Sequence, residues 1–293
     1  MIDEAEILAP LAEPAFEILA TGHQFCEAVR EGADGAVYYS DLTGGGLFGW
    51  RANSGTETVV PGRKWIGGCV LNADGRLIVS GADLVIVDPR TGVITPLLSE
   101  IAGVRVAAIN DIEADASGNL YGGTVDFAAI LDRGEPPAPG LFFRMAPDGA
   151  VEVIREGVSV SNGIGFSPAG DTLYHSECNA GVWAYAYADG RPRDPRMFAA
   201  MDDCDGLAVD AEGGVWVARW REGELLRYRP DAVIDRRIRL PMPHIISLGF
   251  GGPDRADLFV ATGGTARNGD PVGGLVRIRS DIPGLPSHTA RFA

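Results

Sequence analysis

The feature of this sequence that most restricts its fold is a turn signal that recurs along the chain. Each copy has a short apolar stretch, a polar turn ending in glycine, and a second apolar stretch. The turn glycines are Gly35, Gly75, Gly118, Gly170 and Gly213, separated by 40, 43, 52 and 43 residues. A degenerate sixth copy surrounds residues 254–256, before the apolar run from Asp257 to Val260. Repeats of about 40–45 residues built from short strands are typical of β-propeller blades.

The second half of each repeat contains further apolar stretches, and several of these run into hairpin turns such as residues 88–92 and 146–149. Six such units fit a chain of 293 residues, whereas seven would need more chain. The isolated apolar stretch Phe16–Ala20 is then expected to pair with the last carboxy-terminal strand and close the ring, which removes exposed sheet edges. We therefore predict an all-β protein: a six-bladed β-propeller of four-stranded antiparallel blades, forming a single domain over residues 1–293.

A polar residue stands eight positions before the turn glycine in four copies. These residues are Glu27, Asn110, Asn162 and Asp205. The position opens the first strand of a blade, which lines the central channel of a propeller, so the four side chains are expected to converge at one channel mouth. Asp and Asn are also common turn formers. A turn former does not need this constant register, however, so the pattern favours a functional site.

Two long loops are expected above the same mouth. Residues 125–139 lie between the second and third strands of the third blade, and residues 262–273 occupy the same place in the sixth blade. Loops of this length in compact folds are often lids. The first insertion carries Phe127, Ile130 and Leu131, which would make the space beneath it apolar.

Composition excludes several classes of partner. The net charge of −15 argues against binding to a nucleic-acid backbone and agrees with attraction of a cation. No apolar run approaches the ~18 residues of a membrane span, and the acidic start is unlike a signal peptide. The four cysteines, Cys26, Cys69, Cys178 and Cys204, lack metal-site spacing and are expected to be reduced and buried in a cytoplasmic protein. The sequence indicates no oligomeric state.

Two carboxylates and two amide oxygens at one mouth suit a hard divalent cation such as Ca²⁺, Mg²⁺ or Mn²⁺. Among other candidates, His244 precedes the first strand of the sixth blade and could line a substrate pocket, and His23 could face the same mouth. His175, with Glu177, could shuttle a proton, but strand packing is the favoured interpretation. His288 is expected to be solvated in the tail. The chain has no Gly-x-Ser-x-Gly motif to support a serine nucleophile.

The segments Glu27-Ala28-Val29, Asn110-Asp111, Ser161-Asn162-Gly163 and Asp205–Asp210 resemble the signature of the regucalcin–gluconolactonase (SMP-30) family, and the likeness covers nearly the whole chain. It implies a metal-dependent lactonase, a carboxylic ester hydrolase acting on a small lactone or ester. Glu27, Asn162 and Asp205 would hold one divalent ion, with calcium, manganese, zinc, magnesium and ferrous iron all open. Asn110 would contact the bound water or the substrate. Asp205 would be the general base, or only a ligand.

The sequence departs from this family pattern in two places. The first motif usually reads Glu-Gly-Pro, and sugar-lactone members often carry an Arg at the position of Ala108. Together with the apolar insertion, Ala108 predicts a lactone less polar than a sugar lactone, because hydroxyl groups would stay unpaired there. Asn110, His244 and Phe127 are the expected substrate contacts. The alternatives are a non-catalytic propeller that binds a partner, and a metal-dependent isomerase or hydratase.

Overall fold

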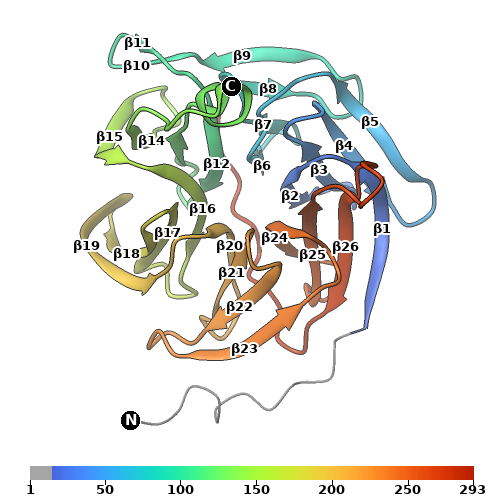
Figure 1. Ribbon diagram of the computed structural model, residues 1–293. Helices are drawn as coiled ribbons and strands as arrows, with labels where there is room; N and C mark the ends of the chain where they lie inside the picture. Colours follow the sequence, from blue (N-terminus) through green and yellow to red (C-terminus); the bar gives the residue numbers. More distant parts are fainter. Residues whose placement is uncertain (1–14) are drawn as a thin grey trace.

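The repeats fold into six four-stranded antiparallel sheets arranged around a central channel (Figure 1). The computed structural model describes residues 15–293. The predicted six-bladed propeller is confirmed. The acidic amino-terminal start, interpreted above as unlike a signal peptide, lies outside the described residues.

The strands of each blade follow one another in the chain, except in the sixth. Blade one contains β2 (Cys26–Glu31), β3 (Val37–Asp41), β4 (Gly46–Arg51) and β5 (Gly55–Pro61). Blade two contains β6 (Cys69–Leu71), β7 (Leu77–Val79), β8 (Leu84–Val87) and β9 (Ile94–Leu98). Blade three contains β12 (Ile109–Ala114), β13 (Leu120–Thr124), β14 (Gly140–Met145) and β15 (Val151–Val158).

Blade four contains β16 (Val160–Phe166), β17 (Thr172–Cys178), β18 (Gly181–Ala188) and β19 (Arg191–Ala200). Blade five contains β20 (Cys204–Val209), β21 (Val215–Arg219), β22 (Glu224–Tyr228) and β23 (Ile234–Arg239). Blade six contains β24 (His244–Gly251), β25 (Asp257–Gly263), β26 (Gly273–Arg279) and β1 (Phe16–His23). A short ribbon of β10 (Glu100–Ile101) and β11 (Val104–Arg105) connects blades two and three, and η2 (Ala128–Arg133) is one π-helical turn.

The recurring turns have the backbone conformation that favours glycine. The turn glycines Gly35, Gly75, Gly118, Gly170 and Gly213 have φ between +67° and +86°, the left-handed region. In the degenerate sixth turn Arg255 takes this conformation with φ of +56°. Aspartate side chains complete such turns: Asp210 Oδ1, for example, accepts hydrogen bonds from the backbone N–H groups of Glu212 and Gly214.

The ring closes by pairing the two ends of the described chain. Strand β1 pairs antiparallel with β26, so that Phe16 lies opposite Ile278 and Thr21 opposite Gly274. The predicted closing strand is thus confirmed, and it extends to His23. No edge of β26 remains free for pairing with another chain along this ladder.

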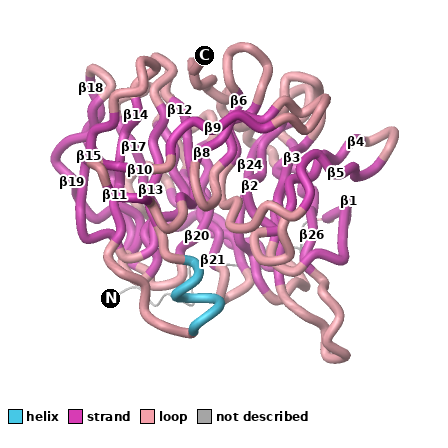
Figure 2. Tube along the Cα trace, turned by 90° about the horizontal axis from the view of Figure 1, so that it is seen from above, coloured by secondary structure: helices cyan, strands magenta, loops and turns pink. Residues whose placement is uncertain are grey.

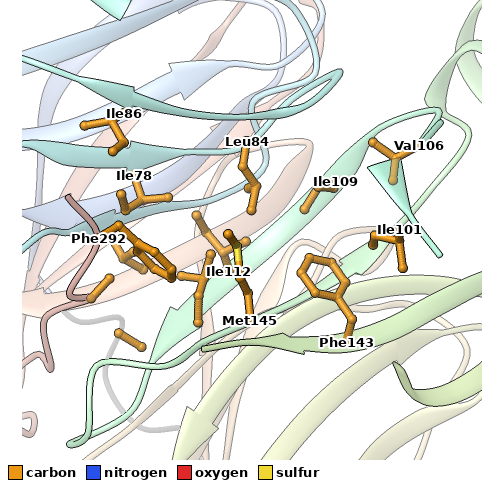
Figure 3. Close-up of a cluster of buried hydrophobic side chains, with 14 residues drawn as sticks. Ile78, Leu84, Ile86, Ile101, Val106, Ile109, Ile112, Phe143, Met145 and Phe292 are labelled. Carbon is orange, nitrogen blue, oxygen red and sulfur yellow. The ribbon is translucent and has the colours of Figure 1, made fainter. Parts of the chain in front are cut away.

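Apolar clusters between neighbouring blades form the core. Figure 3 shows one of them, in which Ile78 and Leu84 of blade two pack against Ile112 and Phe143 of blade three. Equivalent clusters fill the other five interfaces between blades. Because each blade is wedged between two such clusters, the inner strands are held in a rigid ring around the channel.

The carboxy-terminal segment crosses the propeller on one face (Figure 1). Its backbone bridges Asp210 through Gly284 and Asn72 through Ala290. The Asn72 amide donates to the carbonyl of Phe292 at 2.8 Å and accepts from its N–H at 2.9 Å. Figure 2 shows η2 on the opposite face, so one end of the channel has the insertion and the other has the tail. Within residues 15–293, no helix is long and apolar enough to cross a membrane.

Candidate active site at the channel mouth

Six equivalent positions form a ring around the channel, which we call the inner ring; five lie on the innermost strands and one lies two residues before β6. The equivalence follows from the pairing of each inner strand with the next strand of its blade. The inner ring consists of Glu27, Gly67, Asn110, Asn162, Asp205 and Ile246. The four polar residues predicted from the sequence thus occupy equivalent places, and all four are buried.

A β-bulge lies at the inner ring in five blades. The ladder register shifts between Glu27 and Arg30 in blade one and between Cys204 and Leu207 in blade five. The same shift occurs in blades three, four and six. In blade one Ala28 takes a φ of +59°. Bulges change the direction of side chains next to functional sites. Here they allow an inner-ring residue and the residue that follows it in the chain both to lie close to the channel.

The two asparagines contact each other directly. Asn110 Nδ2 donates to Asn162 Oδ1 at 2.5 Å and to the carbonyl of Ser161 at 2.7 Å, and its Oδ1 atom is buried without a partner in the described part of the chain. Asn162 Nδ2 donates to the carbonyl of Cys204. Gly67, the blade-two member of the inner ring, makes this arrangement possible: a Cβ there would lie 1.7 Å from Asn110 Oδ1.

The two carboxylates of the inner ring lie in an unfavourable environment for negative charge. Glu27 and Asp205 are 3% and 5% exposed. Burial raises the pKa of Glu27 well above its ordinary value, and the charges of Asp205 and Asp111 raise it further. Burial also raises the pKa of Asp205, with Asp111 and Asp203 adding to the shift. Glu27 Oε2 has no partner among the described residues. A cation between these groups would relieve both effects.

Asp111 is a third carboxylate of this site, and it lies outside the register of the four polar residues predicted from the sequence. Burial raises its pKa to about 7, against the nearby Arg30 and with a further contribution from Glu113. Its Oδ2 atom is buried and unpartnered among the described residues. Arg30 is itself bound to Glu113 at 2.7 Å. In the sequence, Asp111 is marked only by its place directly after Asn110. The β-bulge in blade three is what brings both side chains toward the channel.

A second ring lies two residues before the inner ring, toward the mouth. We call it the outer ring; it consists of Phe25, Trp65, Ala108, Val160, Asp203 and His244. Its first four members belong to one apolar cluster with Phe127 and Ile130 of the insertion. Phe127 is 7% exposed and its ring stacks on Trp65 with centroids 5.7 Å apart. The predicted placement of residues 125–139 between β13 and β14 is confirmed, and the insertion covers this apolar half of the mouth.

The polar half of the outer ring is formed by Asp203 and His244. Asp203 Oδ1 accepts a hydrogen bond from Arg219 Nε at 2.9 Å. His244 is half-buried, and its Nδ1 lies 2.9 Å from the carbonyl oxygen of Trp220. Its ring lies 5.7 Å from the Trp220 ring and 6.5 Å from Phe25, measured between centroids. His244 therefore lies beside the apolar cluster.

The other histidines are held by packing or lie elsewhere. His175 stacks on Phe142 at 4.1 Å between centroids and contacts Ser161 Oγ at 2.8 Å. Burial lowers its pKa to about 3, so strand packing, the favoured interpretation, agrees with the structure. Glu177 is occupied by an ion pair with Arg155. His23 contacts the Tyr39 hydroxyl, and His288 is exposed in the tail, with its ring near that of Phe166. All four cysteines are free and buried, as predicted.

The donor set at the inner ring fits a hard cation through its oxygen atoms. Over residues 15–293, no three His, Cys, Asp or Glu side chains gather closely enough to form a metal site by themselves. A cation here would need the amide oxygens as well as the carboxylates. The unpartnered oxygens of Glu27 and Asn110 supply such acceptors, and an amide oxygen has a second lone pair, which leaves Asn162 Oδ1 available.

Comparison with known proteins agrees with this geometry. Residues 26–264 match the family described as the SMP-30/gluconolactonase/LRE-like region. The chain belongs to this family. The resemblance stated from the sequence motifs is thereby confirmed.

Two curated relatives match most of the chain. The pentonolactonase XacC of Haloferax volcanii is 28% identical over 85% of this chain and 88% of its own length. The L-arabinolactonase of Azospirillum brasilense is 30% identical over 94% of this chain and 92% of its own length.

Solved structures confirm the propeller fold. A regucalcin from Agrobacterium tumefaciens, described as a calcium-binding protein, has a TM-score of 0.81 and 24% identity over 97% of this chain and all of its own. A gluconolactonase from Xanthomonas campestris has a TM-score of 0.78 and 23% identity over 92% of this chain and 89% of its own.

Proposed function

We propose that this protein is a metal-dependent hydrolase that opens a lactone to a hydroxy acid. Its relatives named as lactonases support lactone hydrolysis. The observation that supports the metal dependence is the pair of buried carboxylates, Glu27 and Asp205, each of which is disfavoured in its charged form by burial and by neighbouring carboxylates, with no cationic side chain at the inner ring. Leaving two such carboxylates charged and unpaired costs several kcal/mol, which a bound cation would recover.

In this proposal Glu27, Asn162 and Asp205 hold one divalent cation, and Asn110 contacts the substrate or the attacking water through its free Oδ1. A bound cation supplies Lewis acidity to the carbonyl oxygen of the lactone. Asp205 serves as general base or as ligand only. These two roles differ in what Asp205→Asn does: a base is needed for turnover but not for cation affinity, whereas a ligand is needed for both.

The substrate is proposed to be less polar than a sugar lactone. Four of the six outer-ring side chains are apolar and pack with Phe127 and Ile130. Ala108, 1% exposed, stands where sugar-lactone members often carry arginine. A polyhydroxylated ring would bury several hydroxyls without partners at this wall, at about 1–3 kcal/mol each. An aliphatic or aromatic lactone would instead gain from contact with the Trp65–Phe127 stack.

The test is a panel of lactones graded by polarity, assayed by acid release after chelation and after addition of each candidate divalent cation. We expect no ring opening in chelator, recovery with at least one cation, and higher kcat/KM for apolar lactones. Glu27→Gln should abolish both cation binding and turnover while the protein stays folded. The variant Ala108→Arg should shift preference toward polyhydroxylated lactones. Full activity in chelator, with no cation bound by calorimetry, would contradict the metal role.

A further inference from the structure

Resting on the lactone hydrolysis proposed above, we infer that His244 is a catalytic residue that carries the proton from the attacking water to the ring oxygen of the lactone. The geometry points to this role through two features: the hydrogen bond that orients the imidazole, and its place on the polar side of the mouth.

The imidazole is held in one orientation and one tautomer. A carbonyl oxygen can only accept a hydrogen bond, so at 2.9 Å from the Trp220 carbonyl the Nδ1 atom of His244 must carry the proton. In the neutral ring, Nε2 then presents a lone pair. Among residues 15–293, Nε2 has no hydrogen-bond partner, and the side chain as a whole is only half-buried. This is the arrangement of a positioned base.

His244 lies at the level of the channel mouth, beside the strand that carries Asp205. His244 is the blade-six member of the outer ring, two residues before Ile246 of the inner ring. A Cβ at Gly206, next to Asp205, would lie 2.9 Å from the Ile246 carbonyl oxygen, so β24 and the Asp205 strand are in contact at this level. The Phe25 and Trp220 rings flank the imidazole. The remaining outer-ring members are apolar, apart from Asp203, which is paired with Arg219.

The proposed steps balance without an additional reactant. As the water oxygen bonds to the carbonyl carbon, one water proton moves to Nε2 and the ring becomes an imidazolium. When the bond between the acyl carbon and the ring oxygen breaks, the electron pair stays on that oxygen, which takes the proton back from Nε2. An imidazole supports both directions, because the nitrogen that accepts the proton from water can donate it again. With His244 as the base, Asp205 acts as a ligand.

The leaving oxygen provides the test. δ-Valerolactone releases an alkoxide and needs protonation, whereas dihydrocoumarin releases a phenolate, a far better leaving group. For metal-loaded His244→Gln we expect kcat to fall by about 10²–10⁴ on δ-valerolactone, the range for general acid–base groups. On dihydrocoumarin the loss should be at least about tenfold smaller, with KM little changed on both. Added imidazole should restore part of the kcat, and Mn²⁺ binding by calorimetry should be unchanged.

His288→Gln is the matched control, because His288 is exposed on the opposite face, and it should retain wild-type kcat on both substrates. NMR of ¹⁵N-histidine wild-type protein should show His244 protonated on Nδ1, a readout that does not depend on the variant folding. An active wild type whose His244→Gln variant keeps kcat within about threefold, or loses it equally on both lactones, overturns the role of His244. An NMR spectrum that shows His244 protonated on Nε2 instead of Nδ1 also overturns this role. A wild type that opens no lactone overturns the proposed function itself.

Discussion

Replacing Asp111 by asparagine tests whether the carboxylates at the channel mouth destabilise the cation-free protein. Burial raises the pKa of Asp111 from 3.8 to about 7. The folded state therefore keeps this proton up to about pH 7, while the unfolded chain loses it near pH 4. Between these values the folded state binds more protons, so the free energy of unfolding falls as pH rises and levels off above pH 7.

The size of the effect follows from the shift. About three pKa units at 1.36 kcal/mol each set an upper limit of about 4 kcal/mol for the stability lost across this pH window. The asparagine side chain of the variant cannot ionise, so this part of the pH dependence disappears. Its buried amide keeps an unpartnered group, which costs about 1–3 kcal/mol at every pH. We therefore expect Asp111→Asn to be less stable than wild type near pH 4.5 and equal or more stable near pH 8.

Urea unfolding of chelated protein from pH 4.5 to 8.5 measures this difference. The exposed Glu222 gives a charge-matched control, Glu222→Gln, whose curve should run parallel to wild type. Adding the activating cation at pH 8 should raise the free energy of unfolding of the wild type more than that of Asp111→Asn. The reason is that the positive charge compensates the Asp111 carboxylate, which the variant lacks. Parallel curves for wild type and Asp111→Asn in chelator would refute the assignment of a raised pKa to this residue.

Three further outcomes follow from contacts elsewhere. Gly67→Ala should displace the Asn110 amide, which lowers the free energy of unfolding by about 1–3 kcal/mol and reduces turnover. In the control Gly49→Ala the new Cβ would lie 3.4 Å from its nearest neighbour, so stability and turnover should both stay unchanged. Urea unfolding and kcat measurements check both variants. Asn72→Ala should remove two hydrogen bonds to the tail and cost about 1–3 kcal/mol in calorimetry, with kcat unchanged. Phe127→Ala should raise KM for apolar lactones in steady-state assays, and an unchanged KM would contradict the substrate contact.

The sequence was sufficient for the fold because its signals are local and repeated. A glycine with positive φ between two apolar stretches specifies a hairpin wherever it occurs, and five such copies with a degenerate sixth specify six blades. The closing role of Phe16–Ala20 followed from the same count. The common register of Glu27, Asn110, Asn162 and Asp205 likewise came from counting residues back from each turn.

Contacts between blades could not be predicted by counting residues along the chain. The bulge that brings Asp111 toward the channel has no signature in the sequence, because Asn110 already occupies the position expected eight residues before the turn glycine. The absence of a side chain at Gly67 matters only because Asn110 of the next blade occupies the space. His244 acquired a defined tautomer from a carbonyl in blade five, 24 residues earlier in the chain.

The sequence by itself therefore determined the strands, the turns, the six-fold repeat and the position of the polar ring, because each depends on residues near one another in the chain. Only the tertiary structure decided which oxygens are left without partners, which backbone carbonyl orients His244 and which half of the mouth is apolar. These properties depend on the distance and burial of groups from different blades, and the packing of the closed ring sets both.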